Sequence, residues 1–187
     1  KLNKMKKIIV TVGISGSGKS SWAHEQWKEN PLNTVIVNRD KIRELLFGYT
    51  ESTINYHYSD PNLSKLEKQV TKYEDVIIHE ALNEDKTVIV DATHLEVKYL
   101  ERYKFWNVSV KIVYFDITLK EAIIRDVSRT RQVGEGIISK QYGKYIKRRE
   151  NSKEIENMFK ITTIKLDSSL PTCFIYDIDG TLAHHRN

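Results

Sequence analysis

The chain has 187 residues, of which 40% are hydrophobic and 29% charged, a composition typical of a globular domain with its own core. The excess of 30 Lys and Arg over 25 Asp and Glu gives a formal net charge of +5, which favours polyanionic partners without identifying one. Its single cysteine, Cys173, excludes an internal disulfide framework and a cysteine-based zinc cluster. No apolar run approaches the length of a membrane span, so we expect a cytoplasmic protein with no membrane partner.

Short apolar runs alternate with segments of helical periodicity through the first 130 or so residues. In chain order the sequence predicts strand 7–12, a helix after Lys19 that stops at Asn30-Pro31, strand 34–38, helix 40–48, helix 63–82, strand 87–91, helix 96–106, strand 110–116 and helix 118–129. Asp40 is a candidate cap for the helix that Gly48 ends, and Thr118 caps the last helix with Glu121 at the capping-box position.

This alternation predicts an α/β fold, with a mostly parallel sheet and helices on both of its faces. Ligands of such sheets bind at the carboxyl ends of the strands. The residues at or just past those ends are Gly13, Asn38, Asp91 and Asp116. The polar, tyrosine-rich segment 48–62 is expected to be a loop or a lid over the site.

Residues 13–21, GISGSGKSS, contain the pattern G-x-x-x-x-G-K-[ST] between a predicted strand and a predicted helix. Glycines there let backbone N–H groups point at a phosphate chain, and the helix N-terminus adds a favourable dipole. Lys19 would reach the β- and γ-phosphates, and the Ser20 hydroxyl would bind Mg²⁺. A chance glycine-rich turn is the alternative. The setting favours a P-loop NTPase kinase fold that uses ATP, with a nucleotide site formed by Gly13, Ser15, Gly16, Ser17, Gly18, Lys19, Ser20 and Ser21.

Transfer of a phosphoryl group to a hydroxyl requires a carboxylate that positions the nucleophile and takes its proton. Asp40 follows the second predicted strand, in VNRDKIR, and is well placed for that role. Arg43 projects from the same helix face three residues later and could hold an anion carried by the acceptor. The alternative is that Asp40 only caps its helix and that Arg43 is a surface charge.

Asp91 closes a third apolar strand, in VIVDATHL, as a Walker B carboxylate would. There it could hold Mg²⁺ through water or brace Arg43, whereas an aspartate that only forms the turn is the alternative. Thr93 and His94 face the same region. We expect His94 to be a hydrogen-bonding loop residue rather than a catalyst, because Asp40 already supplies the base.

Arg125 and Arg129 lie four residues apart in RDVSRTR, on one face of the last predicted helix, and Arg131 follows in a loop. Such a lid could close over the triphosphate, and an arginine that stabilises the transition-state charge contributes on the order of 10³ to 10⁵ in rate. Solvated helix charges are the alternative.

The segment 139–153, SKQYGKYIKRRENSK, places basic residues at helical spacing with tyrosines between them: Lys140, Lys144, Lys147 and Arg148, with Tyr142 and Tyr145. Basic side chains neutralise backbone phosphates and aromatic faces stack on bases, so this helix could bind nucleic acid. A solvated helix with its tyrosines turned inward is the alternative.

Taken in order, TVGISGSGKSSWA, NRDKIR, VIVDATHL, RDVSRTR and FIYDIDGTLA resemble the bacteriophage-type polynucleotide 5′-kinase/3′-phosphatase family. The resemblance covers essentially the whole kinase domain. It implies transfer of the ATP γ-phosphate to the 5′-hydroxyl end of DNA or RNA in nucleic-acid repair. It also implies that Asp40 is the general base and that Arg43 binds the phosphate on the 3′ side of the acceptor nucleotide. Lys19, Arg125 and Arg129 would hold the ATP phosphates, and the catalytic set would be Asp40, Lys19 and Arg129.

The resemblance departs at the third strand. The family has an aspartate immediately before the threonine, whereas here Ala92 precedes Thr93 and the carboxylate is at Asp91. Other P-loop kinases have the order D-A-T. The substrate-binding role that the family pattern suggests for Asp91 and Thr93 therefore stays open.

The final segment resembles the first motif of haloacid-dehalogenase phosphatases, in which Asp177 would be the nucleophile and Asp179 the acid/base. That chemistry also needs a lysine and acidic residues further downstream. We therefore expect a kinase domain over 1–168, only the start of a phosphatase domain over 169–187, and no phosphatase activity from this polypeptide.

Two other functions remain open. One is a P-loop kinase of a small molecule, such as a nucleoside, sugar or antibiotic, which would show no dependence on a 3′-phosphate of the acceptor. The other is a phosphatase or a nucleic-acid-binding module whose P-loop acts only as a switch. The choice between DNA and RNA and the formation of a homo-oligomer also stay open.

Overall fold

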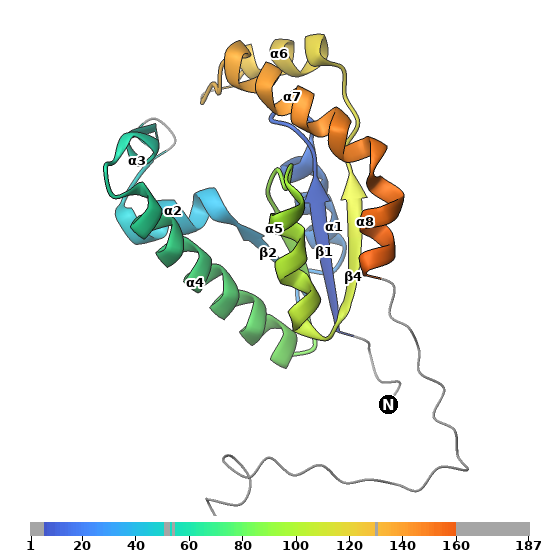
Figure 1. Ribbon diagram of the computed structural model, residues 1–187. Helices are drawn as coiled ribbons and strands as arrows, with labels where there is room; N and C mark the ends of the chain where they lie inside the picture. Colours follow the sequence, from blue (N-terminus) through green and yellow to red (C-terminus); the bar gives the residue numbers. More distant parts are fainter. Residues whose placement is uncertain (1–5, 51–52, 54, 130, 160–187) are drawn as a thin grey trace, which may run out of the picture.

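A computed structural model describes residues 6–50, 53, 55–129 and 131–159 (Figure 1). Four parallel strands form one sheet in the order β2-β3-β1-β4, where β1 is Lys7–Val12, β2 Thr34–Asn38, β3 Thr87–Asp91 and β4 Ser109–Tyr114. The expected domain boundary at 168/169, and the motif with Asp177 and Asp179, lie outside the described residues. The predicted parallel α/β fold is confirmed.

The strands form where the sequence has short β-branched runs. Such runs suit the central strands of a parallel sheet, because helices cover both faces and shield the side chains on either side from water. Within β1, Ile8, Val10 and Val12 enter the larger of two core clusters, whereas Ile9 enters the smaller one on the other face. This alternation follows from the two-residue period of a strand.

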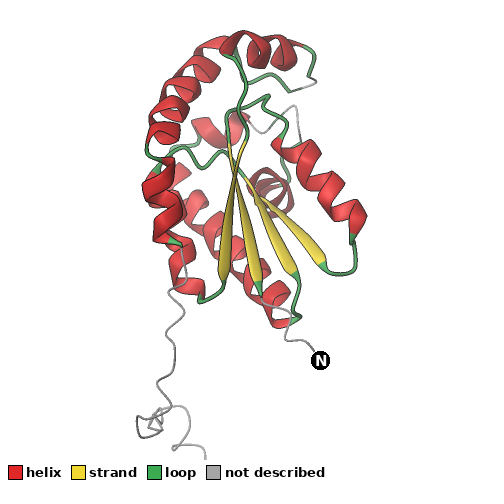
Figure 2. Cartoon of the chain, turned by 90° about the vertical axis from the view of Figure 1, so that its right-hand side faces the viewer, coloured by secondary structure: helices red, strands yellow, loops and turns green. Residues whose placement is uncertain are grey.

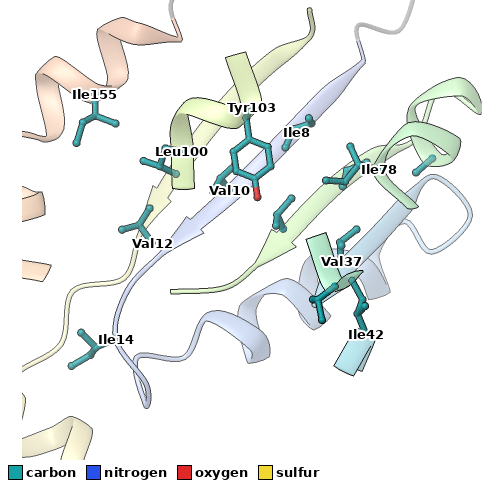
Figure 3. Close-up of a cluster of buried hydrophobic side chains, with 14 of the residues drawn as sticks. Ile8, Val10, Val12, Ile14, Val37, Ile42, Ile78, Leu100, Tyr103 and Ile155 are labelled. Atoms are coloured by element: carbon teal, nitrogen blue, oxygen red, sulfur yellow. The ribbon is translucent and has the colours of Figure 1, made fainter. Parts of the chain in front are cut away.

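The larger cluster lies between the sheet and helices α4 (Leu63–Asn83), α5 (Val97–Glu101), α7 (Glu135–Glu150) and α8 (Ser152–Met158), together with the 3-10 helix η1 (Arg102–Trp106). Its members include Ile78, Leu100, Tyr103 and Ile155 (Figure 3). Ala23 of α1 (Lys19–Glu29) packs with Ile9 and Ile89 in the smaller cluster. Figure 2 shows the resulting arrangement, with the four strands lying among helices. One face of the sheet is therefore covered by several helices and the other mainly by α1.

Some expected elements differ in the structure. The helix expected over 96–106 is split into α5 and η1, and η1 ends at Trp106, before the left-handed residue Asn107. Strand β4 ends at Tyr114 because the neighbouring strand β1 ends opposite it, at Val12. The segment expected to be a loop between 48 and 62 contains a short helix, α3 (Asn55–Ser59).

Helix α6 (Leu119–Val127) ends two residues earlier than expected. Its cap is the predicted one, since the Thr118 hydroxyl accepts the Glu121 amide hydrogen at 3.2 Å. The early end has a local cause: the buried carboxylate of Asp126 accepts the amide hydrogens of Val133 and Gly134. These bonds turn the following loop back against the helix, so that it does not continue.

Candidate active site

The glycine-rich segment forms a tight turn between β1 and α1, which the predicted P-loop requires. A Cβ atom on Gly13 would lie 2.7 Å from Oγ of Ser17, and one on Gly16 would lie 2.9 Å from the carbonyl oxygen of Ala122. Gly16 also has φ +83°, a conformation that side-chain-bearing residues rarely adopt. Gly16 therefore lets the loop pack directly against α6, whereas Gly13 leaves room for Ser17 within the loop.

Contacts from three other segments hold this loop. The amide of Gly13 donates to the carbonyl oxygen of Thr93 at 3.1 Å, so the residue after β3 anchors the start of the loop. The amide of Ser15 donates to the side-chain oxygen of Gln141 on α7, at 2.8 Å. Arg125 on α6 donates to the carbonyl oxygen of Gly16 at 3.3 Å. Helices α6 and α7 thus contact the loop from the side of the predicted lid.

Lys19 begins α1, and its side chain folds back over the loop with only 8% of the residue's surface exposed. Its ammonium donates to the carbonyl oxygen of Ile14 at 2.7 Å and to Oγ of Ser17 at 3.4 Å. Burial lowers the pKa of Lys19 to about 8, the negative charge of Asp91 opposes the shift, and the positive charge of Arg129 adds to it. A desolvated cation at this position favours an anionic ligand, and a phosphate chain fits that requirement.

Ser20 and Ser21 lie exposed in the first turn of α1, which carries no acidic residue. The helix dipole at this end is therefore not neutralised by its own helix. The Ser20 hydroxyl and the Asp91 carboxylate are hard oxygen donors of the kind that Mg²⁺ prefers. Among the described residues no group of three or more acidic, His or Cys side chains could hold a metal alone. A magnesium ion here would need phosphate oxygens and water as further ligands, which suits a nucleotide site.

Helix α2 (Arg39–Phe47) is capped by Asn38, not by Asp40 as expected. The side-chain oxygen of Asn38 accepts the amide hydrogens of Asp40, at 2.9 Å, and of Lys41, at 3.1 Å. The reason is that Asn38 already ends β2 in an extended conformation, which the capping position requires. The carboxylate of Asp40 therefore lies in the first turn of the helix, free of the cap.

The Asp40 carboxylate has partners from three different segments, although 40% of the side chain is exposed. Its Oδ1 accepts from Nη1 of Arg43 at 2.8 Å and from the hydroxyl of Tyr58 on α3 at 3.3 Å. Its Oδ2 accepts from Nη1 of Arg131 at 2.8 Å. Both oxygens of the candidate base are thus already bound to donors.

Arg43 is buried, with 7% of its surface exposed. Its Nε and Nη2 donate to the two carboxylate oxygens of Glu67 on α4 at 2.8 and 2.9 Å, and its guanidinium lies 5.5 Å from the centre of the Tyr58 ring. Burial works to lower the pKa of Arg43, but the hydrogen bonds to Glu67, together with the charges of Tyr58, Glu67 and Asp40, outweigh burial and raise the pKa. The planar two-bond contact fixes the orientation of the guanidinium.

Glu67 collects three donors. Besides Arg43 it accepts from Arg39, at 2.8 Å, and lies 2.6 Å from Nε2 of His57, a fully buried ring stacked on Phe47. Burial works to raise the pKa of Glu67, but the bonds from Arg43, Arg39 and His57 lower it to about 2. Arg39 also pairs with buried Glu74, so an ion-pair network joins α2 to α4 behind the candidate base.

The residues after β3 form a second hydrogen-bonded group. Oδ2 of the buried Asp91 accepts from the side-chain amide of Asn38 at 2.8 Å, whereas Arg43 takes Glu67 and Asp40 as partners. Asp91 thus braces the cap of α2, one step removed from Arg43. The buried ring of His94 lies 2.8 Å from the carbonyl oxygen of Thr11, and burial lowers its pKa to about 4. His94 is a neutral hydrogen-bonding loop residue, as expected.

The predicted lid arginines lie close to the P-loop, but not on one helix face. Arg125 is on α6 and pairs with Glu121, while Arg129 lies beyond the helix end and is exposed. The charge of Arg129 contributes to the lowered pKa of Lys19, which locates it near the loop.

The tyrosines of α7 turn towards the core, as the alternative interpretation of this helix predicted. Tyr145 is buried and donates to Asp116 at 2.7 Å, and Tyr142 packs against the core. Lys144 pairs with Glu96 at 2.7 Å, whereas Lys140 and Lys147 are exposed. The buried ring of Tyr145 therefore cannot stack on a base, which was one of the two interpretations of this segment.

Sequence reasoning missed Glu67, Tyr58 and Gln141. Glu67 lies on a long amphipathic helix full of charged residues, so no pattern sets it apart from its solvated neighbours. The tyrosine-rich composition of 48–62 was the one signal for Tyr58. Gln141 gave none, because its contact with the P-loop spans 126 residues of sequence.

Comparisons with known proteins support a kinase-type P-loop domain. A family model described as an AAA domain matches residues 8–151. A curated protein of Autographa californica nuclear polyhedrosis virus, "Putative bifunctional polynucleotide kinase/RNA ligase", is 28% identical over 100% of this chain and 26% of its own length. The chain therefore spans about a quarter of that relative.

Among solved structures, a chain of the Pnkp1/Rnl/Hen1 RNA repair complex superposes with a TM-score of 0.63 at 25% identity, covering 79% of this chain and 46% of that one. A second structure of the Pnkp1/Rnl/Hen1 complex gives a TM-score of 0.53, also at 25% identity, over 71% and 44%. A chain of the PezAT toxin-antitoxin system of Streptococcus pneumoniae gives 0.56 at 16% identity over 86% and 68%, a likeness of fold alone. Over the part of the chain that the structure describes, no helix is both long enough and apolar enough to span a membrane.

Proposed function

The chain belongs to the AAA domain family, and from that premise we propose that it is an ATP-dependent 5′-hydroxyl polynucleotide kinase acting on the ends of DNA or RNA. The P-loop, the parallel sheet and the similarity to a polynucleotide kinase/RNA ligase and to the RNA repair complex support a kinase-type domain. The observation that carries the proposal is the pair of Asp40 and Arg43 on α2, just past the carboxyl end of β2. Glu67 holds the Arg43 guanidinium in one orientation beside Asp40.

The reaction needs a base beside the acceptor hydroxyl. In the proposed step the 5′-oxygen attacks the γ-phosphorus of ATP, the bond between that phosphorus and the β,γ-bridging oxygen breaks, and ADP leaves. Asp40 accepts the proton of the hydroxyl. Lys19 and the amides of the P-loop hold the phosphates, and Arg125 and Arg129 neutralise them from the lid side. A bound Mg²⁺, held through Ser20 and near Asp91, would supply charge neutralisation between the phosphates.

Arg43 gives the proposed acceptor its chemical class. A guanidinium that is fixed by Glu67 and adjacent to the base suits an anion at a set distance from the reacting hydroxyl. The phosphate on the 3′ side of a terminal nucleotide is such an anion. A free nucleoside has no anion there and would lose this contact.

One observation favours a second candidate, a kinase of a small uncharged acceptor. Arg43 is 7% exposed and already has Glu67 and Asp40 as partners, whereas Asp40 is 40% exposed. A small hydroxyl compound could approach Asp40 without any change at Arg43, while a nucleotide phosphate requires Tyr58 or Asp40 to yield space. The two candidates differ in whether an anion on the acceptor raises activity.

The test is transfer of labelled γ-phosphate from ATP to four acceptors: 5′-hydroxyl DNA and RNA oligonucleotides, a nucleoside 3′-monophosphate and a free nucleoside. Asp40→Asn and Arg43→Ala are compared with two variants that remove the same charges elsewhere, Asp85→Asn and Lys72→Ala. We expect labelling of the oligonucleotides and of the 3′-monophosphate, poor labelling of the nucleoside, and loss of transfer only in the first pair. Labelling of the free nucleoside as fast as its 3′-monophosphate would favour the small-molecule kinase.

A further inference from the structure

We propose that Arg131 is a further catalytic residue of the proposed kinase: it pairs with Asp40 while the acceptor is absent and moves to the transferring phosphoryl group when the acceptor hydroxyl takes its place on Asp40. This inference rests on the proposed function. It starts from a contact between residues 91 positions apart in the chain, which joins the lid side of the site to the acceptor side.

The geometry shows a base whose oxygens are both occupied. Nη1 of Arg131 lies 2.8 Å from Oδ2 of Asp40, and Nη1 of Arg43 lies 2.8 Å from Oδ1. The hydroxyl of Tyr58 also binds Oδ1, at 3.3 Å, and shares a hydrogen bond with Arg131. These three donors fill three of the roughly four acceptor sites of the carboxylate, so a substrate hydroxyl that binds Oδ2 competes with Arg131. Release of one donor would leave Asp40 a stronger proton acceptor for that hydroxyl.

Arg131 is the donor that the contacts allow to leave. Arg43 is fixed by its two bonds to Glu67 and lies on the same helix as Asp40, three residues on. Arg131, by contrast, pairs with Asp40 and Tyr58, and its side chain is 22% exposed. Its release breaks one ion pair and leaves the α2–α4 network intact.

The loop is anchored two and three residues after Arg131. The buried Asp126 carboxylate binds the amides of Val133 and Gly134, at 2.9 Å each for Oδ2, which fixes the far end of the loop against α6. That helix also carries Arg125, which reaches the P-loop at Gly16. Arg131 thus follows a helix that contacts the P-loop, while its guanidinium contacts the proposed base. In the proposed exchange the guanidinium would bind the equatorial phosphoryl oxygens, over which charge spreads during transfer.

This exchange has a functional consequence. Without an acceptor, Arg131 covers the Asp40 oxygen that would otherwise activate water, and the pairing also holds the arginine away from the γ-phosphate. Binding of the 5′-hydroxyl releases both constraints at once. Transfer is then coupled to the presence of the acceptor, and hydrolysis of ATP by water is suppressed.

The experiment compares wild type with Arg131→Ala, Arg131→Lys and Lys120→Ala, which removes an exposed positive charge from α6. For each, transfer to a 5′-hydroxyl oligonucleotide, ATP hydrolysis without acceptor, and KM for ATP are measured. We expect Arg131→Ala to lower kcat for transfer by about 100-fold or more, the scale of losing one charged donor to a transition state. Its KM for ATP and its thermal unfolding should match wild type. Hydrolysis relative to transfer should rise, Arg131→Lys should recover part of the transfer rate, and Lys120→Ala should behave as wild type.

Three results overturn the inference in distinguishable ways. If wild type labels oligonucleotide and Arg131→Ala transfers as fast as wild type, Arg131 is not catalytic and the proposed function stands. If transfer and hydrolysis fall in equal proportion with a lower thermal midpoint, the residue has a structural role only. If wild type labels no oligonucleotide at all, the proposed function fails and this inference fails with it.

Discussion

Asn38 binds Asp91 through its side-chain amide and the amides of α2 through its side-chain oxygen, so one residue joins the ends of β2 and β3 to the helix that carries the candidate base. The two residues are direct neighbours in the β2–β3 register. Because Asn38 takes the capping position, the Asp40 carboxylate is not used by the cap and binds side chains of the site instead. The geometry of the proposed active site thus depends on a residue with no expected chemical role.

Replacement of Asn38 separates its two contacts. We expect Asn38→Ala to lower the free energy of unfolding by about 2 kcal/mol, from the lost cap and the buried Asp91 left without its donor. Asn38→Asp keeps a capping oxygen but sets a carboxylate against Asp91, so it should retain the helix and lose transfer. Urea unfolding and phosphate transfer, measured on both variants, check this. Equal stability of Asn38→Ala and wild type would contradict it.

The lowered pKa of Glu67 predicts that its contribution to the free energy of unfolding is lost in acid. Its pKa in the folded protein is about 2, against 4.5 for the free side chain, so its contribution is fully present above pH 4.5 and is lost as the pH falls towards 2. The size is at most about 3 kcal/mol by the linkage relation. Unfolding free energies between pH 2 and 6 should show this loss in wild type.

The matched variant for that measurement is Glu67→Gln, which cannot ionise. This variant should have a lower free energy of unfolding than wild type at pH 6. As the pH falls to 2, it should lose less of that free energy than wild type does, because it has no carboxylate at position 67 to protonate. Asp75 lies on the same helix, and its variant Asp75→Asn tests whether any carboxylate of α4 gives the same result. An unchanged pH profile in Glu67→Gln would show that the Arg43 contact does not stabilise the fold.

Lys19 predicts a pH dependence of ATP binding. In the free protein its pKa is about 8, and a bound phosphate chain would raise it, because an anion stabilises the ammonium. Affinity for ATP should therefore be constant below about pH 8 and fall as the pH rises above it, with uptake of a proton on binding. Calorimetry in buffers of different ionisation enthalpy measures that proton. The dependence should vanish in Lys19→Met and persist in Lys28→Ala, an exposed residue at the other end of α1.

Gly16 and Gly143 give opposite predictions for the same substitution. At Gly16 an added methyl group meets the Ala122 carbonyl oxygen in a left-handed backbone, so Gly16→Ala should lower the free energy of unfolding by about 1–3 kcal/mol and displace α6 from the loop. At Gly143, inside α7, nothing lies within 4 Å of the added atom. There the helix should gain about 0.5–1 kcal/mol. Thermal unfolding of both variants measures these changes. A Gly16→Ala variant more stable than wild type would contradict the close approach of Gly16 to the Ala122 carbonyl oxygen.

Much of the fold could be predicted from the sequence, because it depends on local patterns. The β-branched runs of β1 and β3 predict buried parallel strands, and the glycine spacing of 13–18 predicts the turn between β1 and α1. Thr118 was recognised as a cap because capping acts over three residues. The cap of α2 was assigned wrongly since Asn38 and Asp40 are both good capping residues two positions apart, and only the length of β2 decides between them.

The sequence by itself determined the phosphate-binding loop, the parallel α/β architecture and the proximity of Asp40 to Arg43, since each follows from spacing within one strand, turn or helix. Only the tertiary structure decided what surrounds the candidate base and its arginine: Glu67 from α4, Tyr58 from α3 and Arg131 from the loop after α6. It also decided that Gln141 of α7 binds the P-loop. These contacts join residues 18 to 126 positions apart in the chain. No local period carries such information, because it depends on how the helices pack around the sheet.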